Sequence, residues 1–206
     1  MNRPAPTSAV VIRNAQPCDE AAILDICLRT SDSGQDGSQH YTDARLPGLL
    51  WALPYVRFCR ENAFVLTQRG VVMGYCVAAP HTTVYEDWLE AAWWPVLKEE
   101  LRDFSARTAE DKNILSYIQS PSRTSARVTK RYPAHLHINL LPELQNGGHG
   151  SSLLRHQLNA LMMSGAEGVH LGVNQHNEKV VAFYAKFGFV EIDRTPSILL
   201  AKRFVD

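Results

Sequence analysis

Eight consecutive residues in the last third of the chain have the composition of an anion-binding turn. Residues 145–152 read Gln-Asn-Gly-Gly-His-Gly-Ser-Ser and lie between an apolar strand pattern and an amphipathic helical pattern. Without side chains at Gly147, Gly148 and Gly150, the backbone can bend with positive φ and direct successive N–H groups at one point. The helix that follows adds its unpaired first amides and the positive end of its dipole. The pattern therefore favours phosphate or pyrophosphate binding over a turn without a ligand.

The residues that follow the last glycine restrict the type of phosphate ligand. A nucleoside-triphosphate loop has Lys and then Ser or Thr at this point, whereas this chain has Ser151 and Ser152. A dinucleotide fingerprint that starts at Gly148 requires a small residue where Leu153 stands, and the preceding chain offers no early first strand. The spacing therefore excludes a P-loop and disfavours a dinucleotide site.

The segments around the turn alternate between strand and helix. The last third predicts strand 136–141, helix 151–163, strand 169–173, helix 178–187, and strands near 190 and over 198–201. The first third predicts strand 10–12, a helix after Asp19, a loop over 31–38, a helical region over 49–58, and a hairpin of 63–66 and 71–77. A strand–helix–strand crossover indicates an α/β sheet with parallel neighbours and a ligand site at the carboxyl ends of the strands.

The 206 residues fit a single domain, residues 1–206, with an irregular helical insertion over 80–133. The tail of this insertion, residues 120–131, has four basic residues and no acidic one, which predicts a flexible, solvated cationic segment. Trp88, Trp93 and Trp94 have helical spacing, which favours packing over an acceptor pocket.

Composition excludes several classes of partner. Twenty-one basic residues balance twenty-one acidic ones, so neither nucleic acid nor an anionic membrane is an expected partner. The first eleven residues carry two prolines and only a short apolar run, and no apolar stretch is long enough for a span, so a cytoplasmic location is predicted. His135 and His137 have ligand spacing but lack an acid or Cys partner, so no metal is expected.

Two motifs resemble the GNAT family of N-acetyltransferases. The first is Gln145-x-x-Gly148-x-Gly150, which is similar to that family's pyrophosphate loop. The second is Asn177 followed by residues 182–184, Ala-Phe-Tyr, and 187–189, Phe-Gly-Phe, at the family's usual distance along the chain. The resemblance implies the GNAT fold: an α/β (α+β) arrangement with a mixed, mostly antiparallel sheet of six to seven strands, helices on both faces, and a helical insertion between the third and fourth strands.

Three further segments resemble bacterial relatives of the C-terminal acetyltransferase-like domain of O-GlcNAc hydrolases. They are residues 29–36, which contain Arg-Thr-x-Asp-Ser-Gly-x-Asp, residues 93–95, Trp-Trp-Pro, and residues 136–142, Leu-His-Ile-x-Leu-Leu-Pro. The glycoside hydrolase domain is absent from this sequence.

The resemblance implies acetyl-CoA as cosubstrate and an amine as acceptor, with direct attack in a ternary complex. The implied cofactor-binding residues are Leu140, Leu141, Gln145, Asn146, Gly147, Gly148, His149, Gly150, Ser151, Asn177, Phe183 and Tyr184. Among these, the Leu140 amide is implied as the donor to the thioester carbonyl, and Tyr184 as the general acid for the leaving thiolate. Ser151 and Ser152 stand where basic residues often follow in this family.

The acceptor side of the reaction is less determined. Asn139 stands where a carboxylate base would be useful, and Asn cannot accept the proton. Asp32 and Asp36 lie on the loop that borders the acceptor groove in this family, where they either attract a cationic substrate or are solvated loop acids. Two alternatives stay open: a homodimer, and a non-catalytic pseudo-acetyltransferase that acts as a binding module.

Overall fold

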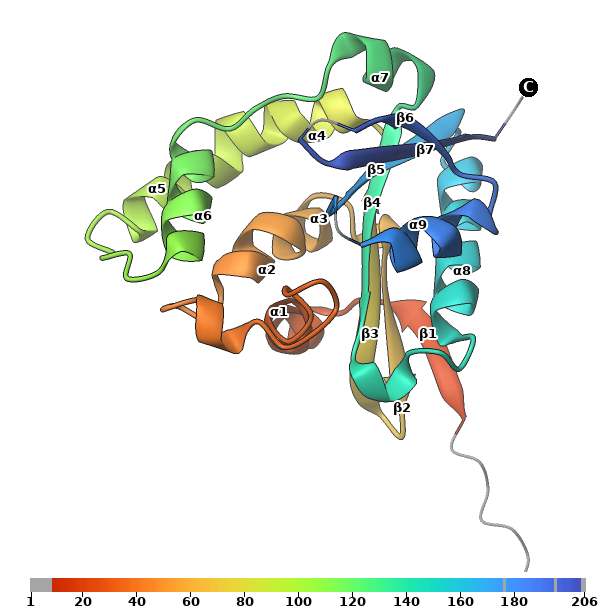
Figure 1. The fold of residues 1–206 in the computed structure, drawn as a ribbon, viewed down its shortest axis with the longest axis horizontal. Helices are drawn as coiled ribbons and strands as arrows, with labels where there is room; N and C mark the ends of the chain where they lie inside the picture. The colour runs from red at the N-terminus through yellow and green to blue at the C-terminus, as the bar shows by residue number, and fades with distance from the viewer. Residues whose placement is uncertain (1–8, 176, 195, 205–206) are drawn as a thin grey trace, which may run out of the picture.

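The protein is built around one seven-stranded sheet with the order β1-β2-β3-β4-β5-β7-β6 (Figure 1). The computed structural model describes residues 9–175, 177–194 and 196–204. Neighbouring strands are antiparallel except for the parallel pair β4 and β5. The predicted mixed, mostly antiparallel sheet is therefore confirmed. Most of the residues used to predict a cytoplasmic location, 1–8, lie outside the described residues.

The strands are β1 Val10–Asn14, β2 Ala63–Gln68, β3 Val71–Ala79, β4 Ala134–Leu140, β5 Gly168–Val173, β6 Val190–Asp193 and β7 Ile198–Arg203. The α-helices are α1 Glu20–Leu28, α2 Leu46–Trp51, α3 Leu53–Phe58, α4 Thr82–Trp88, α5 Trp94–Glu100, α6 Ala109–Gln119, α7 Ala126–Arg131, α8 His149–Met163 and α9 Glu178–Ala185. Short 3-10 turns are η1 Pro17–Asp19, η2 Ser38–His40, η3 Arg60–Asn62 and η5 Pro142–Leu144, and η4 Leu89–Trp93 is a π-helical turn. None of the helices in the described ranges is both long and apolar enough to cross a bilayer.

Strand β3 separates two hydrophobic cores because successive side chains point to opposite faces of a sheet. Tyr75 and Val77 are fully buried on one face, in the core that packs against α1–α6. Cys76 and Ala78 are fully buried on the other face, in the core that packs against α8 and α9. Helices therefore cover both faces of the sheet, as predicted (Figure 1).

The helical region predicted over 49–58 is divided into two short helices, α2 and α3. Pro47 and Pro54 each stand at the second residue of one of these helices. Proline has no N–H to donate and is tolerated in the first turn, so Pro54 ends one helix and starts the next. The break occurs at Ala52, whose backbone leaves the helical region.

The segment 120–131 is largely exposed, as predicted, but the prediction of a flexible loop is wrong, because the segment is anchored and partly helical. Arg123 lies 2.6 Å from Asp87, 3.1 Å from Glu90 and 3.4 Å from Glu86 on the α4–η4 stretch. Val128 of α7 is buried against the sheet. Acidic partners that are distant in sequence and one apolar side chain hold the segment, and its local composition does not reveal either.

Candidate active site

Strands β4 and β5 form a fork. They are paired at only two positions, Ala134 with Val169 and His135 with His170. Beyond these positions the two strands diverge, although β4 continues to Leu140 and β5 to Val173. The edge of β4 that faces β5 therefore has no strand partner over most of its length among the described strands, and apart from the Leu140 carbonyl, which accepts from Gln145, its polar main-chain groups are available to a ligand.

The hydrogen bonds of β4 show which of its groups face the fork. The Leu141 N–H donates to the Met73 carbonyl on β3, at 2.9 Å. Because main-chain direction alternates along an antiparallel strand, the N–H and C=O groups of Leu140 and Ile138 point the other way, into the fork. The predicted Leu140 amide therefore lies on this edge. Ile138, which the sequence analysis did not single out, provides a second amide nearer the branch point, and strand alternation was the signal that could have identified it.

The glycine turn leads from the end of β4 into α8. Its two left-handed residues are Asn146, with φ of 62°, and Gly148, with φ of 79°, directly before the helix. The first amides of α8, at His149, Gly150 and Ser151, have no preceding helical turn to accept them, which makes this end a suitable anion site. The helix starts two residues earlier than predicted, so His149 and Gly150 belong to its first turn.

Gln145 connects this turn to a loop that is distant in sequence. Its side-chain Nε2 donates to the Leu140 carbonyl at 2.9 Å and to the Gly34 carbonyl at 3.3 Å. The second bond spans 111 residues. Gln145 thereby fixes the end of β4 against the loop over 31–38, and its amide satisfies two carbonyl groups that would otherwise lack a donor.

The first turn of α8, the end of β4 and α9 meet at one point. A side-chain carbon at Gly150 would lie 3.9 Å from Leu140 Cδ1 and 3.9 Å from Phe183 Cζ. Two residues of the predicted motif on α9, Phe183 and Tyr184, pack against each other with ring centroids 5.2 Å apart. Asn177 caps α9, and its carbonyl accepts from the Val180 N–H at 3.1 Å.

Tyr184 is 5% exposed and lies in the core between the sheet and helices α8 and α9. Its hydroxyl has no hydrogen-bond partner among the described residues, but it is not sealed from solvent. Burial, with a smaller contribution from Cys76, raises the pKa of Tyr184. The phenol is therefore protonated at neutral pH and can donate a proton or a hydrogen bond.

The two loop acids have partners of their own. Asp36 accepts from the Ser38 N–H and hydroxyl, at 2.9 and 2.5 Å, and these bonds lower its pKa although it is fully exposed. Asp32 Oδ2 lies 3.6 Å from His40 Nε2. Both acids remain on the surface, and Gln145 connects their loop to the end of β4.

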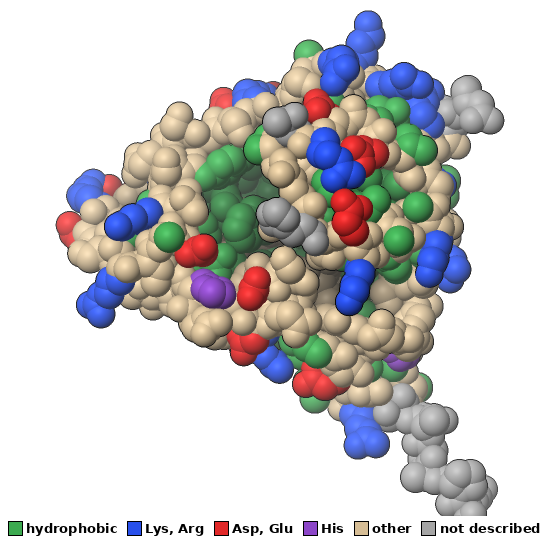
Figure 2. Space-filling view, viewed as in Figure 1, with side chains coloured by type: hydrophobic (Ala, Val, Ile, Leu, Met, Phe, Trp, Pro, Cys, Tyr) green, Lys and Arg blue, Asp and Glu red, His purple; other side chains and the backbone are tan. Residues whose placement is uncertain are grey.

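A hollow with an apolar lining opens beside this loop (Figure 2). It lies between α3 and α4 on one side and the C-terminal strands on the other, with acidic side chains and a histidine at its rim. Ring contacts run from η4 to β4 through Trp93, Trp88, Phe58, Tyr85, Tyr55 and His135. Trp88 and Trp93 are therefore part of an aromatic cluster, and the buried Trp94 packs against Tyr117, which agrees with the packing role predicted for all three.

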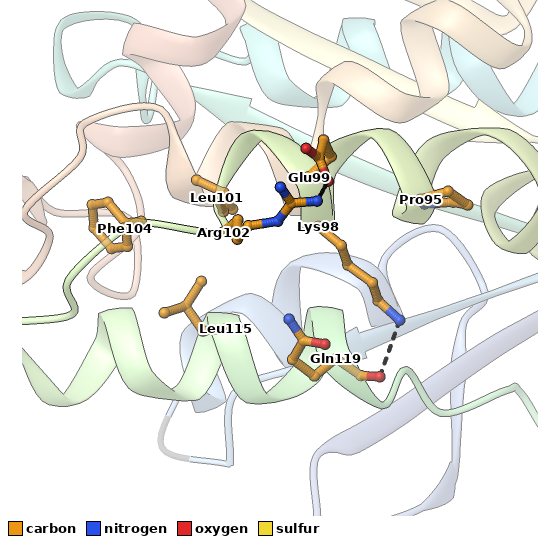
Figure 3. Close-up of a pocket in the computed structure, with 8 residues that line it drawn as sticks. All are labelled: Pro95, Lys98, Glu99, Leu101, Arg102, Phe104, Leu115 and Gln119. Atoms are coloured by element: carbon orange, nitrogen blue, oxygen red, sulfur yellow. Dashed lines mark hydrogen bonds and ion pairs between the residues drawn. The ribbon is translucent and has the colours of Figure 1, made fainter.

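A second, open pocket of about 530 Å³ lies between α5 and α6, apart from the fork (Figure 3). Lys98 and Arg102 line it together with Leu101, Phe104 and Leu115. Lys98 donates to the Gln119 carbonyl, and Arg102 pairs with Glu99, so both cations are already neutralised or bonded. No predicted site residue lies in this pocket. In the described part of the chain, no group of three side chains could hold a metal ion.

Known proteins are similar to this chain in sequence and in fold. Residues 83–189 match the family described as Acetyltransferase (GNAT) family. Protein O-GlcNAcase from Rattus norvegicus is 25% identical over 197 residues, which cover 91% of this chain and 21% of that protein. The chain thus spans about a fifth of the length of the curated relatives that it matches.

Two crystal structures illustrate the structural similarity. SsHAT is 32% identical, with a TM-score of 0.88, and the match covers 96% of this chain and 100% of that one. A GNAT family acetyltransferase from Brucella melitensis, solved in complex with acetyl-CoA, is 16% identical, with a TM-score of 0.53. That match covers 97% of this chain and 90% of the other, and at this identity it shows the fold alone.

Proposed function

Because the chain belongs to the GNAT acetyltransferase family, we propose that it transfers the acetyl group of acetyl-CoA to an amine by direct attack in a ternary complex. The observation that carries this proposal is the fork between β4 and β5, which ends at the glycine turn before α8. The fork exposes main-chain donors and acceptors in a row, and the turn adds a cluster of amides at its end. This arrangement suits an extended thiol ester with a diphosphate at one end.

The proposed cofactor site uses mainly backbone groups. The amides of residues 146–151 hold the pyrophosphate, supported by the dipole of the 15-residue helix α8. The open edge of β4 pairs with the pantetheine arm through Leu140 and its neighbours, while Phe183 and Asn177 form the opposite wall. Ser151 supplies a hydroxyl instead of a charge, so the affinity depends on geometry more than on charge pairing.

The reaction requires two groups beside the thioester. An amide of β4 donates to the carbonyl oxygen as negative charge develops on it, and Leu140 is our assignment, with Ile138 on the same edge. Tyr184 gives its proton to the sulfur as the C–S bond breaks. The high pKa of this phenol keeps the proton available at neutral pH.

The acceptor enters from the hollow beside the loop over 31–38. Asp32 and Asp36 are exposed at this loop and attract a cationic amine toward the site. The apolar lining of the hollow favours an amine with an apolar body (Figure 2).

Tyr184→Phe tests the assignment of the acid. Removal of a general acid lowers kcat by about 100-fold or more, while calorimetry should give an unchanged affinity for acetyl-CoA because the ring remains. Tyr117→Phe on α6 is the matched control, since its hydroxyl bonds only the Ser122 carbonyl and lies outside the fork. Turnover of Tyr184→Phe equal to that of wild type would remove Tyr184 from the mechanism.

The similarity to the O-GlcNAcases supports a second proposal, a binding module within the same fold. A binding module does not need the intact turn and phenol, so a measurement of acetyl-CoA binding distinguishes the two proposals. Tight acetyl-CoA binding with release of free thiol supports the transferase. No affinity for acetyl-CoA in calorimetry supports the module.

A further inference from the structure

Three histidines gather where the fork begins. His135 and His137 alternate on β4, and His170 on β5 stacks on His135 with ring centroids 5.5 Å apart. The Tyr55 ring lies 5.0 Å from the His135 ring and 5.4 Å from the His137 ring. Both β4 imidazoles therefore project to the face of the sheet that packs against α3.

Hydrogen bonds fix two of the three rings. The Thr82 hydroxyl donates to the Pro133 carbonyl at 2.7 Å, so it accepts from His135 Nδ1–H at 2.8 Å. His170 Nδ1 lies 2.8 Å from the Tyr132 carbonyl, which can only accept. Both rings therefore carry their proton on Nδ1 and have a structural role in joining β4 and β5 to the segments around them.

His137 has no such bond. Among the described residues it has no hydrogen-bond partner, and its ring nitrogens are not sealed from solvent in the half-buried side chain. Its neighbour on the same face, Asn139, donates its side-chain amide to the Tyr75 hydroxyl at 2.7 Å and cannot accept a proton. Both ring nitrogens of His137 are therefore free of hydrogen bonds to the described residues, whereas the His135 ring on the same face of β4 is held by Thr82 through Nδ1.

The surroundings of His137 keep it neutral. Burial, followed by the proximity of His170, lowers the pKa of His137 to about 4. The titratable groups that face it are uncharged at neutral pH: burial lowers the pKa of His135 and His170, and it raises the pKa of Tyr55 and Tyr85. The imidazole is thus present as a free base throughout the physiological range.

The position of His137 suits the reacting atoms. It is adjacent to Ile138, whose amide faces the fork, so its side chain leaves the strand beside the place where the thioester would lie. The His137 ring lies beside Tyr55, on the face of the sheet from which the acceptor approaches in the proposed function. A general base needs contact with the proton that it removes.

Resting on the proposed function, we infer that His137 accepts the proton of the acceptor nitrogen during acetyl transfer. The cationic amine first loses one proton to solvent. As the neutral amine nitrogen then bonds to the thioester carbon, its N–H becomes acidic and His137 takes the proton. The C–S bond then breaks, and the sulfur receives a proton from Tyr184. One proton leaves nitrogen and one arrives on sulfur, so the products are the amide and free thiol, and both side chains are reset by exchange with solvent.

The test compares His137→Gln with His135→Gln, a matched control on the same strand face. Release of free thiol is measured from pH 6 to 9 with three acceptors: benzylamine, spermidine and a lysine peptide. We expect His137→Gln to lower kcat by about 100-fold near neutral pH, with less loss at high pH and unchanged acetyl-CoA affinity. His135→Gln should lower the melting temperature and leave kcat close to that of wild type.

Each outcome leads to a decision. If His137→Gln stays within about threefold of wild type across the pH range, or if His135→Gln alone shows the pH-dependent loss, the role of His137 is refuted and the transferase stands. If wild type releases no thiol with any of the three acceptors, the proposed function fails and this inference fails with it.

A measurement on the wild-type protein covers the case in which His137→Gln does not fold. Long-range nitrogen–proton NMR of the histidine rings reports which ring nitrogens carry protons. At pH 7 with acetyl-CoA bound, we expect one unprotonated nitrogen on His137. An imidazolium there would overturn the inference.

Discussion

The turn before α8 and the first turn of α8 contain two glycines, Gly148 and Gly150, that should respond to alanine in opposite directions. Gly148 has a left-handed backbone with φ of 79°, and no atom lies within 4 Å of the position where a side-chain carbon would be. Gly150 lies in the first turn of α8, and a side-chain carbon there would be in ordinary contact with Leu140 and Phe183 at 3.9 Å. The cost at Gly148 is therefore purely conformational, and Gly150 has no steric cost.

The magnitudes follow from the backbone. A left-handed conformation costs an L-residue about 1–2 kcal/mol, and the reduced entropy of the unfolded chain returns about 0.4–1 kcal/mol. Gly148→Ala should therefore lower the free energy of unfolding by about 1 kcal/mol, or about 2–4 °C in melting temperature for a chain of this size. Gly150→Ala should leave stability equal or raise it by up to about 1 kcal/mol, because alanine favours the helix.

Thermal unfolding of both variants and acetyl-CoA calorimetry of Gly148→Ala check this prediction. If the amides before α8 hold the pyrophosphate, Gly148→Ala should also weaken acetyl-CoA binding by about fivefold to tenfold, near 1 kcal/mol, because the relaxed turn redirects these amides. Equal melting temperatures for Gly148→Ala and Gly150→Ala would refute the role assigned to the left-handed bend. Unchanged affinity in Gly148→Ala would refute the amide site.

Two further predictions concern the polar contacts around the fork. Gln145→Met should lower the free energy of unfolding by about 1–3 kcal/mol, because it leaves the Leu140 and Gly34 carbonyls without their donor. Thermal unfolding measures this change, and a loss below about 0.3 kcal/mol would contradict the prediction. The protein should also lose stability as the pH falls from 7 to 5, since the pKa of His137, about 4 in the folded protein, lies below its value of about 6.5 in the unfolded chain. The unfolded chain takes up the proton first, so stability is complete above about pH 6.5 and falls below it, by about 1 kcal/mol for this half-buried group. A melting temperature that is constant or rises over this interval would contradict the sign.

The sequence by itself determined the elements whose signals are local. The two apolar runs at 63–66 and 71–77, joined by a short link with Gly70, predicted the antiparallel hairpin of β2 and β3, because a strand–turn–strand pattern involves only neighbouring residues. The glycines at 147, 148 and 150 predicted a bend before a helix, but only Gly148 among them has a positive φ, and Asn146 is the other left-handed residue of the turn. The order of strands and helices in the last third also followed from periodicity, because the spacing of apolar residues that distinguishes a strand from a helix is a property of neighbouring residues.

Only the tertiary structure decided the features that depend on distant partners. The fork exists because β5 leaves β4 after two pairs, and strand pairing is not encoded by either strand alone. Gln145 bonds across 111 residues to Gly34, and Arg123 anchors its segment to acids on α4 and η4. The sequence presented His135 and His137 as two equivalent residues on one strand face. Their difference arises from Thr82, which bonds one ring and leaves the other free.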